Sequence, residues 1–369
     1  MRVVAHLASV HNRTDNRVFY KQCIGLAGSG YSVKLIVGDG KGDTIIQGVE
    51  VLDFIPFSYR SRLIRIFIVS PIIMVKALKL RVGLYHIHDP ELLLYYLIFS
   101  PFFGSKKVIF DMHENLSEQV KGKLWVPRIF RGFLALLIRK YENLVFRKIP
   151  VIFAENSYVK HFPLVKKYEI VLNYPSSNWA NTKPYVKQPN HVPTIGYIGR
   201  IGVDRGIDTL LASIVSINKL GRKLQVELIG NIPQDISESV NFKYLDLRDL
   251  IKTPGFVPND VAVEIVKAWD VGFCVLKDQP NFIESYPTKL FEYFVAGVPV
   301  VTSNFPLYQE LVEVIGGGIC ISPDSEIQLS QAITKILNTP DKYSANIDLV
   351  EYGWSSQLSK LVAFYRAIL

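Results

Sequence analysis

The stretch NFIESYPTKLFEYFVAGVPVVTSN, residues 281–304, has the pattern of a loop, a short helix, a glycine stop and a buried strand. Pro287 suits the first turn of the helix, because its missing N–H would have no partner there. Glu284 is then expected in the loop before the helix, and Glu292 about one turn inside it. Gly297 ends the helix, and the apolar run that follows predicts a strand.

The two carboxylates of this stretch flank a helix N-terminus, where free backbone N–H groups favour anions. A site of this kind can hold a ligand that is both anionic and rich in hydroxyl groups, and a nucleotide sugar has this character. The alternative is that Glu292 faces solvent and Glu284 only interacts favourably with the helix dipole. The spacing alone favours neither interpretation.

Strand and helix patterns alternate at short intervals throughout the chain. The apolar runs VVAHLAS (3–9) and YSVKLIVG (31–38) flank a helical pattern, and PTIGYIG (193–199) starts a second series. This alternation predicts parallel α/β sheets. In such sheets, ligands bind beyond the carboxyl ends of the strands.

The length of 369 residues favours two domains. The segment 176–192 is rich in Asn, Ser and Pro, has no apolar period and is interpreted as a linker. We therefore expect an N-terminal domain at 1–175 and a second domain at 193–350. Residues 351–369 form a separate C-terminal segment that ends in a helix.

Three widely separated cysteines, Cys23, Cys274 and Cys320, lie in apolar contexts and show no metal-ligand spacing. They indicate buried free thiols in a reducing compartment. The first residues, MRVVAHLASVHN, contain too short an apolar run for a secretory signal. These features predict a cytoplasmic protein.

The net charge of +9 is unevenly distributed. Residues 1–175 carry 25 Lys and Arg against 13 Asp and Glu, whereas the remaining residues carry 17 against 20. The excess positive charge of the first half indicates an acidic or membrane-surface partner.

Two basic segments of the first half, 56–82 and 121–148, are rich in large apolar residues, among them Trp125, Phe130 and Phe133. The run IFIVSPIIMV in the first segment is too short to cross a bilayer. Both segments resemble amphipathic elements that lie in an anionic membrane interface. The alternative is a core helix with a solvated basic face. Nucleic acid is disfavoured, because the basic residues are interleaved with large aliphatic ones.

Polar residues follow three predicted strands of the first half. The loop His11 to Arg17 is a candidate site by position, and its alternative interpretation is a capping turn with Asp15 as N-cap. His86 and His88 share one face of a strand that ends in Asp89.

The strand KKVIFDM is followed by His113. Two neighbouring strands that each end in His and carboxylates suggest a metal site, but later in the chain there are only His161 and His191, both in loop-like contexts. A hydrogen-bonding role at the sheet edge is more economical, and at least one of these histidines has a structural role in this interpretation.

The second domain opens with a strand that leads into a turn with two arginines. Gly199 and Gly202 let the backbone approach a ligand, and Arg200 and Arg205 supply positive charge beside a helix N-terminus. Arginine suits a pyrophosphate because its guanidinium forms forked hydrogen bonds.

Several motifs converge at this point on one family. The order GYIGR, DRGIDTLL, GFVP, DVGFCVL and then E-x7-E with PTKLFEYFVAGVPVV resembles the family 4 retaining glycosyltransferases of the GT-B fold. The first-half motifs DNRVFYKQ, YHIHDPELL and IFDMHE are similar to a branch that acts in surface polysaccharide (O-antigen, capsule or exopolysaccharide) assembly. The resemblance implies an α/β protein of two Rossmann-like, doubly wound parallel-sheet domains with an interdomain cleft. It also implies that the last helix packs back on the first domain.

The resemblance assigns the donor site to residues of the second domain. Arg200 and Arg205 would hold the diphosphate, Glu292 the ribose and Glu284 the transferred sugar. The backbone from Ser285 to Thr288 would face the distal phosphate. The implied donor contacts are Gly199, Arg200, Arg205, Gly255, Phe256, Val257, Glu284, Ser285, Tyr286, Pro287, Thr288 and Glu292. Of these, Gly255 to Val257 would lie against the base.

By the same resemblance, His113 lies near the transferred sugar and acts in catalysis with Glu284, Arg200 and Arg205. The configuration at the anomeric carbon is retained, and the leaving phosphate assists the acceptor's attack. No metal or cofactor is required, because the arginines and the helix dipole stabilise the departing pyrophosphate.

The first strand–helix loop departs from the family, which often carries a Gly-Gly pair where this chain has SVHNRTDNR. We expect acceptor-side contacts there and nearby, from Asp15, Arg17, His88 and Asp89. The expected partners are a UDP- or GDP-linked sugar, a polyprenyl-pyrophosphate-linked glycan acceptor and an anionic membrane, on whose cytoplasmic face the protein would be peripheral. The alternatives are a sugar-nucleotide epimerase or hydrolase of the same fold, or a non-catalytic nucleotide-sugar-binding protein.

Overall fold

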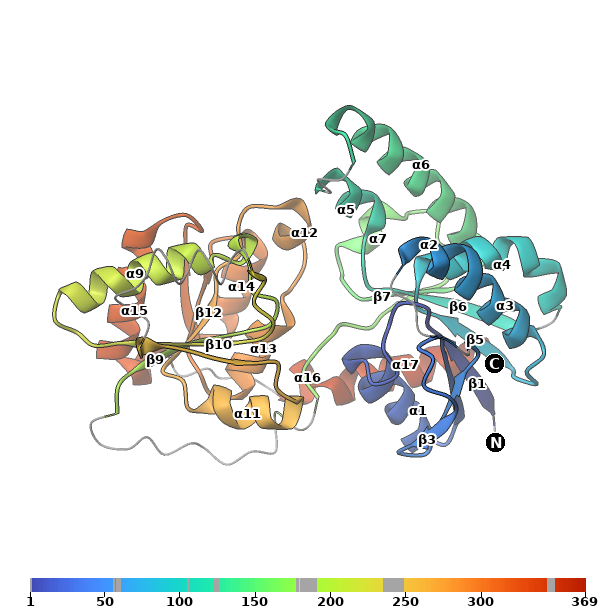
Figure 1. Ribbon diagram of the computed structural model, residues 1–369, viewed down its shortest axis with the longest axis horizontal. Helices are drawn as coiled ribbons and strands as arrows, with labels where there is room; N and C mark the ends of the chain where they lie inside the picture. The colour runs from blue at the N-terminus through green and yellow to red at the C-terminus, as the bar shows by residue number, and fades with distance from the viewer. Residues whose placement is uncertain are drawn as a thin grey trace. The chain divides into compact units, whose positions relative to one another are not determined.

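The computed structural model of the chain divides into two compact units (Figure 1). Unit 1 comprises Met1–Asn173 with Trp354–Leu369, and unit 2 comprises Tyr174–Gly353. The structure describes residues 2–55, 57, 61–104, 106–122, 126–176, 179, 191–234, 249–343 and 349–369. Trp125 and most of the predicted linker 176–192 lie outside the described residues.

Unit 1 contains an eight-stranded sheet with the strand order β3-β4-β2-β1-β5-β6-β7-β8. The strands are β1 (Val3–Leu7), β2 (Ser32–Val37), β3 (Thr44–Ile46), β4 (Val49–Asp53), β5 (Leu84–Ile87), β6 (Lys107–Met112), β7 (Val151–Phe153) and β8 (Tyr168–Ile170). All neighbouring strands pair in parallel except β3, which pairs antiparallel with β4.

The helices of unit 1 cover both faces of this sheet. They are η1 (Asn16–Cys23), α1 (Ile24–Gly28), α2 (Arg62–Ile64), η2 (Arg65–Val69), α3 (Ser70–Leu78), α4 (Pro90–Phe103), α5 (Leu116–Gly122), α6 (Arg128–Phe146), α7 (Tyr158–His161) and α17 (Trp354–Ile368). Among the described residues, no helix is both long enough and apolar enough to cross a membrane.

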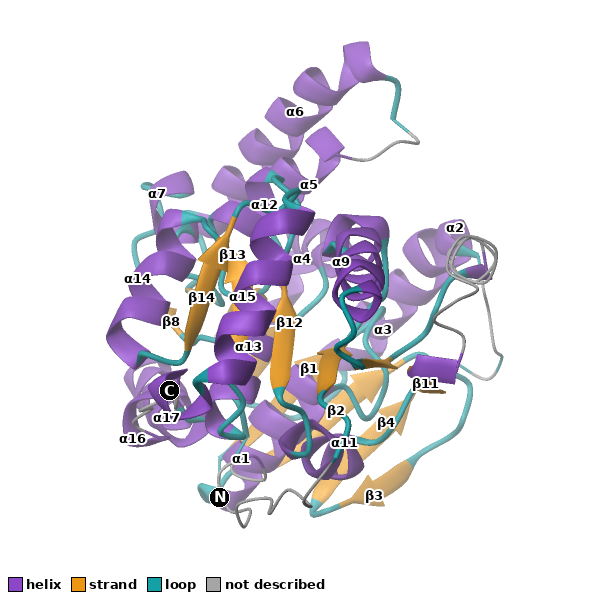
Figure 2. Cartoon of the chain, turned by 90° about the vertical axis from the view of Figure 1, so that its left-hand side faces the viewer, coloured by secondary structure: helices purple, strands orange, loops and turns teal. Residues whose placement is uncertain are grey.

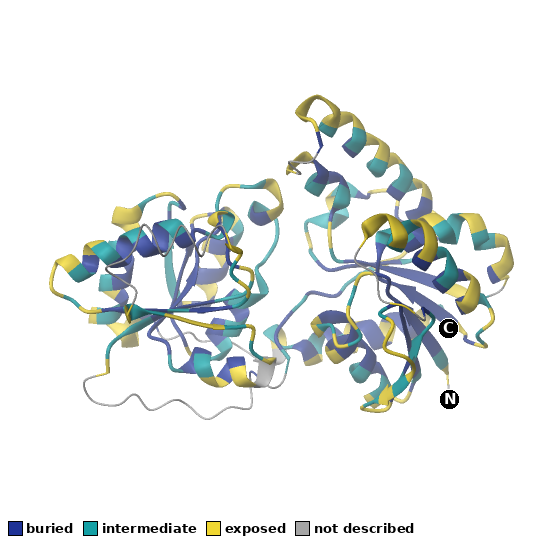
Figure 3. Cartoon of the chain, viewed as in Figure 1, coloured by how far each residue is buried: buried dark blue, intermediate teal, exposed yellow. Residues whose placement is uncertain are grey.

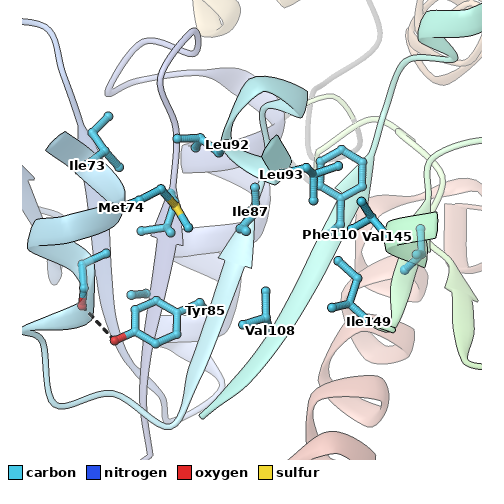
Figure 4. Close-up of a cluster of buried hydrophobic side chains, with 14 of the residues drawn as sticks. Ile73, Met74, Tyr85, Ile87, Leu92, Leu93, Val108, Phe110, Val145 and Ile149 are labelled. Carbon is cyan, nitrogen blue, oxygen red and sulfur yellow. Dashed lines mark hydrogen bonds between the residues drawn. The ribbon is translucent and has the colours of Figure 1, made fainter. Parts of the chain in front are cut away.

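Successive residues of the unit 1 strands enter two different hydrophobic clusters. Tyr85 and Ile87 belong to the cluster that α3, α4 and α6 cover (Figure 4). Leu84 belongs to the cluster that contains Leu361 and Tyr365 of α17. The sheet is therefore buried on both faces, as expected where parallel strands are connected by helices.

Unit 2 contains a six-stranded sheet with the order β11-β10-β9-β12-β13-β14, and all neighbouring strands pair in parallel. The strands are β9 (Thr194–Ile198), β10 (Gln225–Ile229), β11 (Ile251–Gly255), β12 (Val271–Cys274), β13 (Val300–Ser303) and β14 (Gly318–Ile321). Figure 2 shows β12, β13 and β14 side by side. The strand order reverses between β9 and β12, which is where ligands bind in open α/β sheets.

The helices of unit 2 are η3 (Val203–Arg205), α9 (Ile207–Lys219), α11 (Asn259–Lys267), α12 (Pro280–Ile283), α13 (Thr288–Val295), α14 (Pro306–Ile315), α15 (Glu326–Asn338), η5 (Pro340–Tyr343) and α16 (Leu349–Tyr352). The prediction of two doubly wound parallel sheets is confirmed. The antiparallel strand β3 is the exception, and the turn Gln47–Gly48 forms a hairpin that adds it to the edge of the sheet.

The stretch 281–304 folds into the predicted elements. Glu284 lies in the loop after α12, and Glu292 is the fifth residue of α13. Pro287 is the N-cap of α13 and so stands one position before the predicted first turn. Gly297 has a φ of 73°, a left-handed conformation that suits glycine and stops the helix before β13.

Candidate functional site

The turn that follows β9 presents two arginines at the carboxyl edge of the unit 2 sheet. The guanidinium of Arg200 pairs with Asp204, and Arg205 Nε lies 3.6 Å from the same carboxylate. The backbone N–H of Lys277, after β12, donates to the carbonyl of Asp204 at 3.1 Å. These contacts fix the turn to the two strands at which the sheet reverses.

Arg205 connects this turn to the stretch 281–304, which carries Glu284 and Glu292. Its guanidinium carbon lies 4.3 Å from the ring centroid of Phe282, which is two residues before Glu284. The hydroxyl of Tyr308 donates to the carbonyl of Phe282 at 2.7 Å and holds α12 in place. The predicted diphosphate and sugar contacts therefore lie on neighbouring elements.

The thiol of Cys274, at the end of β12, responds to charges from both of these elements. Burial raises its pKa to about 11, Lys289 and Arg205 oppose that shift, and Glu292 adds to it. Because all three charged groups act on one thiol, they converge at the end of β12.

A row of glycines brings the predicted base contacts to the same edge. Gly199 donates to the carbonyl of Ile229, and Gly230 donates to the carbonyl of Gly255, both at 2.9 Å. A Cβ on Gly230 would lie 2.0 Å from the carbonyl oxygen of Gly199, so a side chain cannot be accommodated there. The segment Gly255–Val257 thus leaves the edge strand beside the arginine turn, with the Phe256 ring 77% exposed.

The remaining predicted donor contacts are all half-buried. This holds for Glu284, Ser285, Tyr286, Pro287, Thr288 and Glu292. The hydroxyl of Ser285 donates to the carbonyl of Asn281, and the ring of Tyr286 packs edge-on against Phe291 at 5.5 Å. The structure therefore places these residues at the start of α13, as predicted.

In unit 1, the carboxyl ends of β1, β5 and β6 also carry a polar cluster. The carboxylate of Asp89 accepts the backbone N–H groups of Ser9 and Val10, at 2.6 and 2.9 Å. Its other oxygen pairs with His11 Nδ1 at 2.8 Å. Although burial opposes both shifts, this pairing lowers the pKa of Asp89 to about 2 and raises the pKa of His11 to about 9. His11 is therefore an imidazolium at neutral pH.

His113 lies beside this ion pair, with its ring centroid 4.7 Å from that of His11 and the two rings nearly perpendicular. Its Nδ1 is 3.2 Å from the carbonyl oxygen of Asp111, which can only accept a hydrogen bond. Nδ1 therefore carries a proton and donates it to this carbonyl. Both rings are half-buried and lie in the same edge of the sheet.

Behind this edge is a fully buried polar network centred on Asp111. Its carboxylate accepts two hydrogen bonds from Arg17, at 2.9 and 2.6 Å, and one from Gln22 at 2.8 Å. His88 Nδ1 lies 3.3 Å from the same carboxylate, and His88 Nε2 lies 2.8 Å from His6 Nδ1. Because a buried charge is stabilised by such partners, Arg17 and Asp111 hold each other ionised.

The network extends to the C-terminal helix. The hydroxyl of Tyr365 on α17 lies 2.7 Å from His86 Nδ1 and 3.2 Å from His6 Nε2. Hydrogen bonds inside unit 1 thus link β1, β5 and β6 to one another and to α17.

The structure corrects the predicted acceptor-side contacts. Arg17 and His88 are buried and bonded to Asp111, so their side chains are not available to a ligand. Asp15 accepts the backbone N–H groups of Arg17 and Val18 and is the N-cap of η1, which was the alternative interpretation. Asp89 is 1% exposed and holds the loop after β1.

Two groups among the described residues place three possible metal ligands within 4.8 Å of one another. One consists of His6, His86 and His88, and the other of His11, Asp89 and His113. In the first group the nitrogens are hydrogen-bonded to one another and to Tyr365, and in the second His11 is paired with Asp89. Either group would have to give up these contacts to bind a metal ion.

Comparison with known proteins bears on unit 2 above all. Residues 181–350 match the family model described as glycosyl transferases group 1. The matched residues include the arginine turn and the two glutamates.

Two curated relatives, both from Streptomyces kanamyceticus, are similar over part of the chain. The 2-deoxystreptamine glucosyltransferase is 23% identical over 148 residues, which are 40% of this chain and 37% of the relative. The alpha-D-kanosaminyltransferase is 21% identical over 184 residues, which are 48% of this chain and 46% of the relative. The chain thus spans less than half the length of these relatives.

Solved structures resemble the whole chain. The sucrose-phosphate synthase of Thermosynechococcus elongatus has a TM-score of 0.73 at 17% identity, over 100% of this chain and 99% of that one. Anabaena HepE, in complex with UDP and glucose, has a TM-score of 0.67 at 16% identity, over 99% and 97%. At these identities the likeness establishes the fold, which is the predicted GT-B fold of glycosyl transferases.

Two residues of these sites were missed in the sequence. Lys289 stands in the first turn of α13, where a cation opposes the helix dipole. A lysine at a predicted helix start was therefore a usable signal in the sequence. His11 lies in the loop from His11 to Arg17, which was a candidate site because it follows a predicted strand. Its pairing with Asp89, 78 positions further along the chain, leaves no local trace in the sequence.

The buried histidines predict a loss of stability in mild acid. Burial, first of all, lowers the pKa of His6, His86 and His88 in the folded state, with Asp111 acting in the opposite direction. Unfolding therefore takes up protons below about pH 6.5, so stability is present above that pH and is lost as the pH falls. We expect the free energy of unfolding to fall as the pH is lowered from 7 to 6, with His11, whose pKa is raised, acting in the opposite direction.

Urea unfolding at the two pH values measures this drop, and hydrogen exchange in α17 assigns it to unit 1. The variant His86→Phe, which removes one titrating group, should show a smaller pH slope than the wild type. An equal slope in both proteins would contradict the assignment of the proton uptake to this network.

Proposed function

We propose that the chain is a retaining glycosyltransferase that moves a sugar from a nucleotide-sugar donor to a lipid-linked glycan acceptor at a membrane surface, in surface polysaccharide synthesis. The observation that carries the proposal is the contact between Arg205 and Phe282. It joins the arginine turn to the stretch that carries Glu284 and Glu292, within residues that match the family model of group 1 glycosyl transferases. The solved structure of HepE with UDP and glucose supports a uridine diphosphate sugar as the first donor to test.

In this proposal, Arg200 and Arg205 bind the diphosphate and stabilise the charge that develops on it as the sugar departs. Glu284 accepts hydrogen bonds from hydroxyls of the transferred sugar, and Glu292 accepts them from the ribose. The start of α13 directs backbone N–H groups toward the distal phosphate. Arg205, Glu284 and Glu292 are half-buried and Arg200 is exposed, at the edge where the strand order reverses, which favours binding there.

His113 is proposed to act from unit 1. With its proton on Nδ1, it presents Nε2 as an acceptor for a hydroxyl of the sugar or of the attacking acceptor. The acceptor's hydroxyl attacks the anomeric carbon on the face from which the diphosphate leaves, and a phosphate oxygen takes its proton. Neither the attack on the anomeric carbon nor the proton transfer requires a metal ion in this scheme. Activity should therefore survive treatment with EDTA.

The experiment begins with a thermal-shift screen against UDP, GDP, ADP and CMP, because a ligand of the folded state raises its apparent stability. The matching nucleotide sugar is then incubated with short glycan acceptors, and the product's anomeric configuration is read by NMR. Retained configuration supports the proposal, and inverted configuration rejects the mechanism. Donor turnover without an acceptor would favour the alternative of an epimerase or hydrolase.

The membrane part of the proposal rests on apolar side chains that unit 1 leaves in solvent. On α6, Ile129 is 82% exposed and Phe133 is 62% exposed. Further exposed apolar residues of the same unit are Leu63, Phe67, Ile98, Phe102, Phe130, Leu136, Leu137 and Leu144. Figure 3 shows the exposed class along α6. A buried core helix, the alternative interpretation, would have covered these residues.

Basic side chains accompany this apolar surface. Arg128, Lys140, Arg147 and Lys148 on or just after α6 are all exposed. An apolar surface with exposed cations suits an interface of anionic lipids, since the apolar groups enter the acyl boundary and the cations meet the headgroups.

We expect the double variant Phe130→Ser and Phe133→Ser to lose binding to vesicles that contain phosphatidylglycerol. The measurement is co-sedimentation at low and high salt. A matched control is Val314→Ser with Ile327→Ser, which changes two apolar residues of unit 2 that are 68% and 72% exposed. Equal recovery in the supernatant with and without vesicles for the wild type would reject the membrane proposal.

A further inference from the structure

Lys289 lies in the first turn of α13, at the edge of the sheet that carries the arginine turn. Its ammonium donates to the hydroxyl of Tyr197 at 2.9 Å and lies 4.1 Å from the centroid of the same ring. The Tyr197 hydroxyl in turn donates to the carbonyl of Arg200 at 2.7 Å. Lys289 is therefore bound through one hydroxyl to the backbone of the arginine turn.

The ammonium also lies directly against Gly199. A Cβ built on this glycine would lie 3.2 Å from Lys289 Nζ, and the glycine has a φ of 126°. A larger residue would be strained there and would crowd the ammonium. The missing side chain leaves the ammonium next to open backbone at the end of β9.

The other cations at this edge have carboxylate partners. Arg200 and Arg205 share Asp204, and Lys277 pairs with Asp324 at 2.6 Å. Among the residues that the structure describes, Lys289 has hydrogen-bond and ring contacts with Tyr197 only, and no carboxylate pairs with it. Its ammonium thus has no direct carboxylate partner among the described residues, although Glu292 lies one turn further along α13.

The helix adds to this positive field. α13 spans Thr288–Val295, so Lys289 is its second residue and lies at the positive end of the helix dipole. A lysine at this end is unfavourable for the helix alone. An anion bound between the ammonium, the first N–H groups of α13 and the arginine turn would remove that conflict.

From this juxtaposition of Lys289, Gly199 and the N-terminus of α13 we infer that Lys289 is a third cation of the diphosphate site and binds an unesterified phosphate oxygen of a nucleoside diphosphate. An ammonium has three donors, and Tyr197 uses one, so two remain for the phosphate. This inference rests on the proposed function, and it adds a direct ligand contact that neither the E-x7-E pattern nor the two arginines include.

The test measures binding of UDP, and of GDP if the wild type prefers it, by isothermal titration calorimetry. Lys289→Met should weaken nucleoside diphosphate binding by about tenfold or more, since it removes a charge-assisted contact. Binding of the uncharged nucleoside should change little. The control Lys335→Met removes an exposed lysine of α15 and should bind the nucleoside diphosphate as the wild type does.

A second variant separates direct binding from a positioning role. Tyr197→Phe removes the hydroxyl that links Lys289 to Arg200 but keeps the ammonium. If Lys289 binds phosphate, Tyr197→Phe should retain most of the affinity that Lys289→Met loses. If Lys289 only positions the arginine turn, the two variants should lose affinity equally, and the inference is overturned.

The outcomes also distinguish this inference from the function on which it rests. A wild type that binds none of the nucleoside diphosphates rejects the proposed function itself. A wild type that binds one of them, together with a folded Lys289→Met variant of equal affinity, rejects the role of Lys289 alone. If Lys289→Met does not fold, Lys289→Gln, which keeps a hydrogen-bond donor without the charge, replaces it in the same comparison.

Discussion

Arg205→Met is expected to reduce the rate of sugar transfer by about 10²–10³-fold at saturating donor, in line with the loss of a group that stabilises developing charge. The side chain of Arg205 is 22% exposed, and its guanidinium is stacked on Phe282. In the proposed reaction, this contact would hold the guanidinium in position before the diphosphate departs. Methionine keeps the apolar contact with the ring and removes the charge, so the loss reports on electrostatics.

The matched control for this variant is Arg222→Met. Arg222 is half-buried and bonds Asn338 on α15 at 2.7 Å. Its removal should leave transfer within about threefold of the wild type, because the change touches no interaction made in the transition state. If Arg205→Met and Arg222→Met transfer sugar at similar rates, the arginine turn does not stabilise the leaving group.

The unit 2 site was largely predictable from local patterns. Gly297 marks the end of α13 by its left-handed φ, and the apolar run after it can only be buried in the sheet. Glu284, Glu292 and Arg205 follow from their places relative to predicted helix starts. Because the carboxyl ends of parallel strands share one edge, predicting the strands was enough to bring these residues together.

The unit 1 site was not predictable in the same way. Arg17, His88 and Asp89 were correctly placed at strand and loop ends, but the direction of each side chain depends on partners far along the chain. Arg17 turns inward because Asp111, 94 positions away, is buried there and accepts two hydrogen bonds from its guanidinium. A sequence shows which residues can pair but does not show which pairs form. The half-buried position at this edge is therefore occupied by His11, to which no contact was assigned, and not by Arg17 or His88.

Asp111→Asn is expected to destabilise unit 1 by about 3–5 kcal/mol, the usual cost of breaking a buried ion pair by removing one partner. Asp111 is fully buried, and its pKa is held well below the usual range by Arg17, whose charge outweighs the opposing effect of burial. Asparagine keeps the shape but leaves the Arg17 guanidinium, 7% exposed, without a counter-charge. Urea unfolding measures the change, with hydrogen exchange in β6 assigning the transition to unit 1.

The control is Asp324→Asn in the ion pair with Lys277, where the side chain of Asp324 is 77% exposed. This loss should be at most about 1 kcal/mol, because solvent screens an exposed pair. If Asp111→Asn loses no more stability than Asp324→Asn, the guanidinium of Arg17 has found another partner or is reached by water.

The double variant Arg17→Met with Asp111→Asn identifies the source of the loss. If the cost comes from the unpaired guanidinium, removing that charge as well should recover most of the stability, since an apolar replacement of a buried pair is often tolerated. If the double variant is as unstable as Asp111→Asn, the cost comes from the hydrogen bonds of Gln22 and His88 to the carboxylate. In the first case the network serves mainly to bury Arg17, whereas in the second it holds β5, β6 and η1 together and thereby positions His113.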